Sequence, residues 1–264
     1  MKALLVGAIV LQASWAFSGT SKSPEKRKSS DPATAAAAPA PESAVASTSL
    51  PLLPPPTQPI DLALVLQRFQ DLDVRLKSLQ ADFRQFVSWD ASGTKQSVEG
   101  NVEFRKPDLL RIEQRVPEPQ TVVADGSWLW IYRPSTSQVV KANFAEWKKS
   151  EPLAQGLLDF GNYARLFQTY DVSLSTASAP DKDGHRLLTL TMKPKGKGED
   201  FALTLKLSTR DYFPAETELK AGGVAVHSFF SNIRYNPALP DARFRFTPPA
   251  GADVFENVKP PRPQ

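Results

Sequence analysis

An alternating pattern of apolar and polar residues runs through Val98-Glu-Gly-Asn-Val-Glu-Phe-Arg-Lys-Pro-Asp-Leu-Leu-Arg-Ile112. Apolar residues and a glycine share one face of an extended chain, and acidic and amide residues share the other. Lys106-Pro-Asp108 ends the first run, because proline has no backbone N–H to give to a sheet. The pattern resumes at Leu109. The stretch therefore predicts two successive strands, each with one buried face.

The same period of two recurs on both sides of this stretch. Turn signals at Asp125-Gly126, Asp183-Gly184 and Gly222-Gly223 separate several of the runs. No helix-length segment lies between most of them, so we expect one mainly β fold with an antiparallel sheet of about ten strands. The further strands are predicted at residues 81–89, 121–124, 127–133, 138–142, 170–176, 186–193, 201–208, 214–221, 224–235 and 244–247.

Two segments carry helical patterns. Apolar residues spaced by three and four over residues 61–80 predict an amphipathic helix with Asp61 as its N-cap. Residues 144–168 are rich in aromatic residues and leucine, which predicts two short helices inserted between strands. So few helices cannot cover a long flat sheet. The sheet either packs on a second sheet as a sandwich or curls into an incomplete barrel around a helical plug, and the curled sheet needs fewer elements.

One strand departs from the alternation. Trp128-Leu-Trp-Ile-Tyr132 is apolar on both faces. Either this is a central strand covered on both sides, or one of its faces lines a groove for a hydrophobic ligand.

The ends of the chain differ from its middle. Residues 1–16 combine one lysine, an apolar run and a Ser-Trp-Ala ending, which predicts a secretory signal peptide cleaved after Ala16, with an uncleaved single-span anchor as the alternative. Nine of the 24 prolines fall in residues 19–59, so residues 17–59 are predicted to be an Ala/Pro/Ser-rich disordered spacer. Residues 60–255 form the predicted domain, and 256–264 a loose tail.

Composition excludes several classes of function. The chain has no cysteine and only two histidines, which removes thiolate chemistry and leaves little for a metal site. The net charge of +4 accompanies no nucleic-acid-binding motif. His185 and His227 stand alone, and the paired glutamates Glu99 with Glu103 and Glu216 with Glu218 are expected on solvated strand faces. We expect no catalytic residue, no metal and no cofactor, and therefore not an enzyme.

The order and spacing of five segments resembles the outer-membrane lipoprotein carrier protein, the LolA family. The resemblance covers residues 60–255. The segments are Leu79-Gln-Ala-Asp-Phe-Arg-Gln85, Gly100-Asn-Val-Glu-Phe-Arg-Lys-Pro-Asp-Leu-Leu-Arg-Ile112, Pro119-Gln-Thr-Val-Val-Ala-Asp-Gly-Ser-Trp-Leu-Trp-Ile-Tyr132, Gln138-Val139 and Phe244-Arg-Phe-Thr-Pro-Pro-Ala-Gly251.

The resemblance implies an incomplete antiparallel barrel with an α-helical lid, acting as a monomer in the periplasm. Such a protein accepts acylated lipoproteins from an inner-membrane ATP-driven releasing complex, shields their acyl chains in an apolar cavity and passes them to an outer-membrane receptor. A periplasmic lipid-binding sensor or regulator with a similar half-barrel is the alternative.

The resemblance also implies roles for individual residues. Leu62–Phe69 and Leu153–Phe160 would be lid elements, and the basic residue before the proline, usually arginine in the family, is Lys106 here. Lysine lacks the planar fork of arginine, so Arg105 and Arg111 are alternative latches for the lid. The residues expected to form the cavity and its lid are Leu62, Leu66, Phe69, Phe83, Phe104, Leu110, Ile112, Trp128, Trp130, Tyr132, Leu153, Leu157, Leu158 and Phe160.

Overall fold

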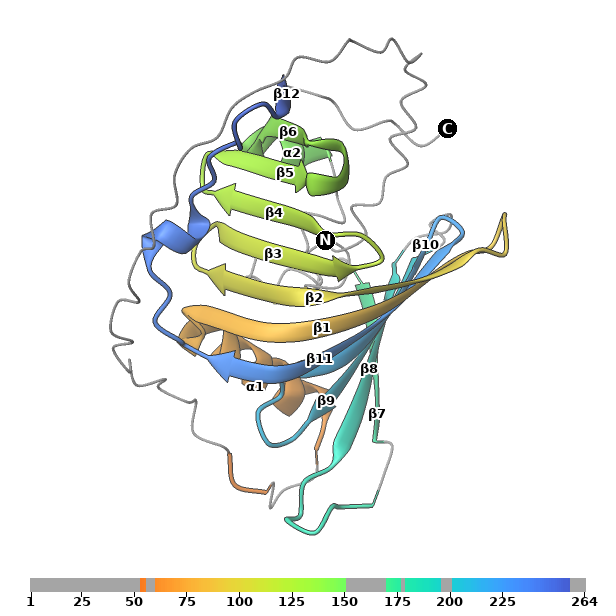
Figure 1. Cartoon of the computed structure of the whole chain (residues 1–264). Helices are drawn as coiled ribbons and strands as arrows, with labels where there is room; N and C mark the ends of the chain where they lie inside the picture. The colour runs from red at the N-terminus through yellow and green to blue at the C-terminus, as the bar shows by residue number, and fades with distance from the viewer. Residues whose placement is uncertain (1–52, 56–59, 151–169, 177–178, 196–200, 257–264) are drawn as a thin grey trace.

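One continuous sheet of twelve strands forms the body of the part of the chain that the structure describes. This computed structural model describes residues 53–55, 60–150, 170–176, 179–195 and 201–256. The strand order is β12-β6-β5-β4-β3-β2-β1-β11-β10-β9-β8-β7, and neighbours are antiparallel except β12, which runs parallel to β6. The sheet curls without closing (Figure 1), so the expected open, mainly β architecture is confirmed, with twelve strands instead of about ten.

The elements have the following bounds. The strands of the first half are β1 (Ser78–Trp89), β2 (Lys95–Arg105), β3 (Leu109–Val116), β4 (Gln120–Asp125), β5 (Trp128–Arg133) and β6 (Gln138–Asn143). Those of the second half are β7 (Tyr170–Thr176), β8 (Leu187–Pro194), β9 (Phe201–Ser208), β10 (Pro214–Ala221), β11 (Val224–Tyr235) and β12 (Asp253–Glu256). The helices are α1 (Leu62–Arg75), α2 (Phe144–Ser150) and the 3-10 turns η1 (Pro134–Thr136) and η2 (Asp241–Phe244).

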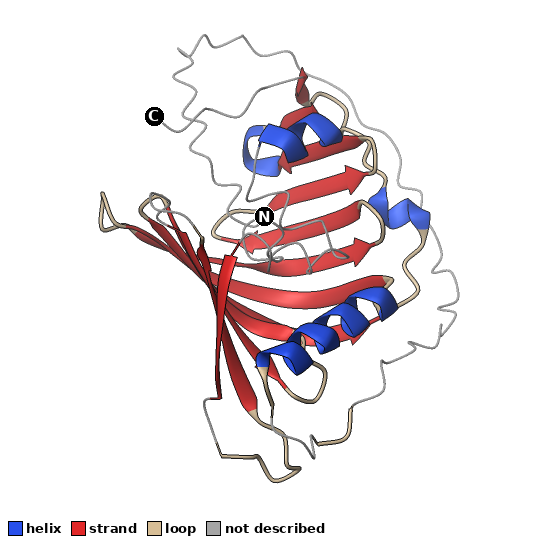
Figure 2. Cartoon of the chain, turned by 180° about the vertical axis from the view of Figure 1, so that it is seen from behind, coloured by secondary structure: helices blue, strands red, loops and turns tan. Residues whose placement is uncertain are grey.

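Both α-helices pack on the same side of the sheet, which we call the inner face. Val65, Phe69 and Leu72 of α1 and Phe144 and Trp147 of α2 are buried in a single core with the strands. Figure 2 shows α1 crossing the middle of the sheet and α2 lying over the end that carries β5 and β6. The opposite side is called the outer face.

The first helix is shorter than its periodicity predicts. It begins at the expected N-cap, where the Asp61 carboxylate accepts from the Leu64 N–H, but it ends at Arg75 instead of residue 80. Asn236 accounts for the change of structure: its side chain donates to the Arg75 carbonyl and accepts from the Lys77 N–H at 2.7 Å. Asn236 lies far away in the sequence, so this cap could not be predicted from residues 61–80.

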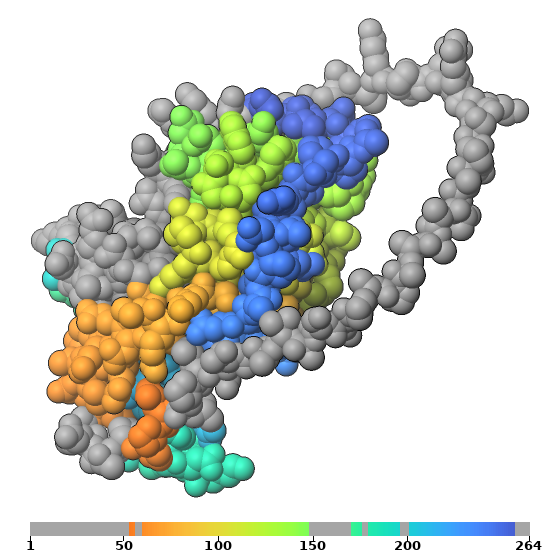
Figure 3. Space-filling view, turned by 90° about the vertical axis from the view of Figure 1, so that its left-hand side faces the viewer, coloured from red at the N-terminus to blue at the C-terminus, as the bar shows by residue number. Residues whose placement is uncertain are grey.

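The C-terminal segment also differs from the prediction. Residues 244–247 were expected to form a strand, but Phe244 ends η2 and the chain then lies over the outer face. Figure 3 shows this segment, in blue, crossing the strands in yellow and green. A short strand that the alternation did not predict, β12, then pairs with β6 through Val254 and Val139.

Several expectations fall outside the described residues. These are the signal peptide (1–16), most of the spacer (17–52 and 56–59), most of the second inserted helical segment (151–169) and the tail from residue 257. The first inserted helix is present as α2. In the described part of the chain, no helix combines the length and apolar character needed to cross a lipid bilayer.

Candidate functional site

The inner face is apolar across almost the whole sheet. One row across β2, β3, β4 and β5 consists of Phe104, Leu110, Ala124 and Leu129, each paired in register with the next. All four are at most 5% exposed. The second half contributes a matching set of buried residues: Leu188, Leu190, Met192, Leu203, Leu205, Leu207, Leu219, Val226 and Phe230.

Four of the predicted cavity residues belong to this inner face. Phe83, Phe104, Leu110 and Ile112 are all buried in the core. Strand register places them together, because Phe104 pairs with Leu110 and the next inward position pairs Val102 with Ile112. Alternation along β2 and β3 was sufficient to predict this placement.

The predicted lid residues of α1 lie against the same core. Phe69 is 1% exposed, Leu62 is half-buried and packs on the core, and Leu66 is half-buried. The other predicted lid residues, Leu153, Leu157, Leu158 and Phe160, lie outside the described residues.

The aromatic residues of β5 lie on the outer face, contrary to the cavity role expected for them. Trp130 pairs with Val123, which pairs with Arg111, and this is the opposite parity to Leu110 and Ile112. The inner face of β5 carries Leu129 and Ile131 instead. Because both parities of this strand are apolar, the sequence pattern could not tell which one points inward.

The outer face of β5 is covered by the chain itself. The rings of Trp130 and Tyr132 lie 5.7 Å and 5.9 Å from the ring of Phe246. The Lys141 ammonium lies 4.3 Å from the centre of the Trp128 ring, and the Trp130 indole N–H donates to Asp125 at 3.0 Å. The outer side of this doubly apolar strand is therefore covered by residues of the chain itself.

Lys106 connects the sheet to α1. Its ammonium donates to the main-chain carbonyl of Asp73 and lies 3.2 Å from the Asp73 carboxylate, which is almost completely buried. The Lys106 backbone N–H donates to the Lys77 carbonyl at 2.8 Å. The end of α1 is thus joined to the end of β2 by a buried charged contact.

Arg105, the alternative latch, holds a different segment. Its guanidinium donates to the Leu239 carbonyl at 2.8 Å and to the Asp241 carboxylate, and it lies 5.3 Å from the centre of the Phe244 ring. The Arg105 guanidinium lowers the pKa of the Asp241 carboxyl. Arg105 therefore fastens the C-terminal segment on the outer face, instead of the described lid element α1.

Arg111, the third candidate, also lies on the outer face. It donates to the Arg243 carbonyl at 3.2 Å and to Glu113 at 2.7 Å. Arg243 in turn makes two hydrogen bonds of 2.9 Å with Glu103, which raise the pKa of the arginine. Among the described residues, Lys106 contacts α1, whereas Arg105 and Arg111 contact the C-terminal segment.

The two histidines sit in structural networks. His227 lies 2.7 Å from Glu216, and Glu216 also accepts from Lys206 on the outer face. His185 is buried, with its Nδ1 3.2 Å from the Thr209 hydroxyl.

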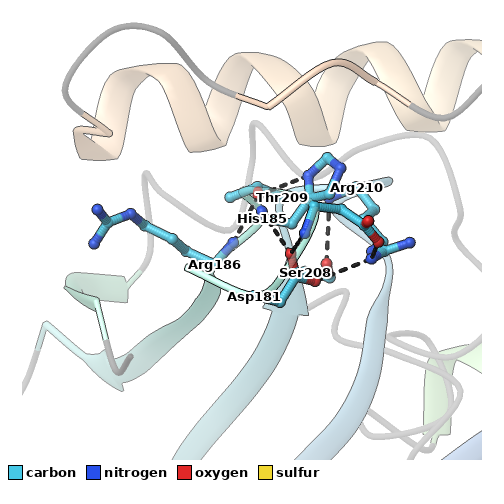
Figure 4. A network of polar contacts seen from close by, with 7 residues as sticks. Asp181, His185, Arg186, Ser208, Thr209 and Arg210 are labelled. Carbon is cyan, nitrogen blue, oxygen red and sulfur yellow. Dashed lines mark hydrogen bonds and ion pairs between the residues drawn. The ribbon is translucent and has the colours of Figure 1, made fainter. Parts of the chain in front are cut away.

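The network around His185 braces one end of the second half of the sheet (Figure 4). Asp181 accepts from the His185 N–H at 2.9 Å and from Arg210 at 3.0 Å. The Arg210 carbonyl in turn accepts from the Leu53 N–H at 2.9 Å, which attaches the end of the proline-rich segment to the domain.

The geometry defines a curled open sheet with an apolar inner face and a helix fastened across it. The family model described as "Outer membrane lipoprotein carrier protein LolA" matches residues 75–247. The chain belongs to the LolA family.

Curated relatives agree with this assignment. The outer-membrane lipoprotein carrier protein of Albidiferax ferrireducens is 31% identical over 204 residues, covering 70% of this chain and 89% of the relative. That of Dechloromonas aromatica is 31% identical over 189 residues, covering 72% and 86%. Among solved structures, the LolA superfamily protein NE2245 from Nitrosomonas europaea aligns over 71% of this chain and 99% of its own, with 13% identity and a TM-score of 0.40.

Proposed function

We propose that this protein is a periplasmic carrier that shields lipoprotein acyl chains against its inner face and moves them from the inner to the outer membrane. The observation that carries the proposal is the largely apolar inner face, over which the contact between Lys106 and Asp73 holds α1. The names of the relatives support the same cargo.

The energetics of acyl chains require such a shield. Burying an acyl chain is worth about 0.8 kcal/mol per CH₂, so a chain with fifteen methylenes gains about 12 kcal/mol. An acylated protein will therefore stay in a membrane unless a comparable apolar surface is offered to it. The inner face supplies that surface on a carrier in the aqueous compartment.

The lid has to be weaker than the cargo contact. Three buried apolar side chains of α1, Val65, Phe69 and Leu72, contribute about 1.5–3 kcal/mol each, or about 5–9 kcal/mol in all. This is less than the gain from one long acyl chain. Entering acyl chains can therefore displace α1 and take its place on the sheet.

The organisation of the chain suits a carrier. In this proposal residues 1–16 direct export, 17–59 are a spacer, 60–255 are the carrier domain and 256–264 are a tail. An inner-membrane ATP-driven complex supplies the lipoprotein, and an outer-membrane receptor accepts it.

Depletion of the protein in its own cell tests the transport role. Fractionated membranes should show outer-membrane lipoproteins accumulating in the inner membrane or the periplasm. Normal lipoprotein sorting, accompanied by a changed stress response, would favour the lipid-binding sensor instead.

A matched pair of variants on α1 tests the binding face. Leu62 packs on the core, whereas Val74 is 80% exposed on the same helix. We expect Leu62→Glu to strengthen binding of an environment-sensitive apolar dye to the purified protein, because it weakens the packing of α1 that the dye has to displace. Val74→Glu should leave dye binding unchanged. Equal dye binding by both variants would contradict the proposed site.

A further inference from the structure

Three polar side chains lie side by side on the apolar inner face. Gln85 of β1 pairs in register with Ser228 of β11, and Ser228 pairs with Thr217 of β10. All three are at most 1% exposed. Their row continues into apolar residues on both sides, to Val98 of β2 and to Leu205 of β9. Within this row, the three polar side chains thus lie on the central strands β1, β11 and β10.

The hydroxyl of Thr217 differs from the hydroxyl of Ser228 beside it. The Gln85 amide donates to the Ser228 hydroxyl at 2.8 Å. Thr217 Oγ1, in contrast, is buried without a hydrogen-bond partner among the residues that the structure describes. A buried hydroxyl left in this state costs about 1–3 kcal/mol, and valine would fill the same space without that cost.

Other buried amides of the inner face are satisfied by the protein itself. Gln114 donates to the Glu118 carbonyl at 3.0 Å, and Gln120 accepts from Arg133 at 3.1 Å. Those residues lie toward the ends of their strands. The row formed by Gln85, Ser228 and Thr217 therefore differs both in its central position and in the unused hydroxyl of Thr217.

We infer that the Thr217 hydroxyl, with Ser228 beside it, donates a hydrogen bond to the carbonyl oxygen that joins an acyl chain to the rest of the cargo. This inference rests on the proposed carrier function. An ester or amide carbonyl has lone pairs and no proton, so it matches a hydroxyl whose proton has no acceptor. The hydrocarbon beyond the carbonyl then contacts the surrounding leucine and valine side chains.

This contact would make the inner face selective. A surface made only of hydrocarbon binds any apolar chain according to its area, whereas a buried donor discriminates against a ligand that cannot pair with it. The row would therefore fix how far an acyl chain enters, and it would favour acyl groups over plain alkyl chains.

A pair of ligands that differ only in the carbonyl tests the inference. Dioctanoylglycerol and its dioctyl ether analogue compete with an apolar dye for the purified protein, and the ratio of their Kd values is measured. We expect wild type to prefer the ester by about 2- to 12-fold, the equivalent of one ordinary hydrogen bond. Thr217→Val should bring the ratio close to one, while Thr217→Ser should preserve the preference.

A control variant and a spectroscopic readout separate this role from a structural one. Thr204→Val makes the same change on the outer face, where Thr204 pairs with Glu218, and should keep the ester preference. The infrared carbonyl stretch of a ¹³C-labelled ester should fall on binding to wild type and to T204V, but not on binding to T217V.

The outcomes distinguish the inference from the function on which it rests. If wild type binds neither ligand, the proposed function fails and the inference falls with it. If wild type binds both ligands equally, or if T217V keeps the ester preference, the inference is overturned while the apolar binding face stands. Equal weakening of both ligands in T217V would also overturn it, because the hydroxyl would then serve only the fold.

Discussion

The ammonium of Lys106 lies 3.2 Å from the carboxylate of Asp73, and this contact ties the end of α1 to the end of β2. Asp73 is buried on the helix, while Lys106 is still partly exposed. Water can therefore reach the Lys106 ammonium and replace Asp73 as its partner when α1 leaves the sheet.

Replacing Lys106 should loosen α1 without unfolding the sheet. Lys106→Met removes the charge that compensates a buried carboxylate, at a cost of about 1–3 kcal/mol. Backbone amides of α1 should then exchange with deuterium roughly 5- to 150-fold faster, while amides of β8 and β9 stay protected. Lys77→Met, at an exposed lysine nearby, is the control. Unchanged exchange of α1 in K106M would show that Lys106 does not hold α1 on the sheet.

A methyl group at Gly100 should destabilise the whole sheet. The Cβ of an alanine would lie 2.3 Å from the Glu113 carbonyl oxygen and 2.7 Å from the Phe83 ring. Overpacking of this kind costs about 1–3 kcal/mol, or about 2–12 °C in Tm. Because the closest atom belongs to the backbone, adding Phe83→Leu should not restore Tm. A wild-type Tm for G100A in thermal unfolding would contradict the packing described for β2 and β3.

Removal of Phe246 should affect the tryptophans and leave ligand binding intact. Phe246→Ala uncovers Trp130 and Tyr132 on the outer face, so acrylamide should quench tryptophan fluorescence more strongly. Affinity for the apolar dye should stay within about twofold, since an outer-face change of this kind costs little on the inner face. Phe86→Ala, at a phenylalanine already 48% exposed, is the control. Loss of dye binding in F246A alone would return the β5 aromatics to the binding site.

Acid should weaken the brace around Asp181. A hydrogen bond from Arg210 holds the pKa of the Asp181 carboxyl below its ordinary value of 3.8. A lowered folded-state pKa adds stability that is present above the unfolded pKa and is lost as pH falls through the folded value. Asp181→Asn should therefore flatten the fall in unfolding free energy below about pH 4. Asp171→Asn, at an exposed position of β7, is the control. Equal acid sensitivity in wild type and D181N would contradict the prediction.

Sequence reasoning succeeded where one face of a strand is polar. Alternation placed Phe104, Leu110 and Ile112 correctly, because a one-residue slip would have buried the charged positions between them. It failed on β5, because Trp130 and Ile131 are both apolar and the pattern does not show which of them points inward. The C-terminal segment, which covers Trp130 on the outer face, is too far away in the sequence to be read from this strand.

Long-range contacts account for the other differences. The helix over 61–80 was predicted too long, because Leu76 and Leu79 continue its spacing and the cap that ends it comes from Asn236. Lys106 and Arg105 are adjacent and chemically alike, so local pattern gives no sign that one contacts α1 and the other contacts residues 239–244. Nothing in the sequence marks Thr217 as a candidate binding residue, because a single threonine is common in β-strands.

The place of β1 between β2 and β11 has a consequence for the order of assembly. Leu79 pairs with Phe104 nearby in the chain and with Tyr235 near its end. During synthesis the first strand therefore waits, with one edge unpaired, until almost the whole domain has been made. Nascent β1 is an edge strand with an apolar face, which is the form of β structure most prone to pair with other chains. The newly made chain therefore exposes the free edge of β1 until β11, near the end of the domain, can pair with it.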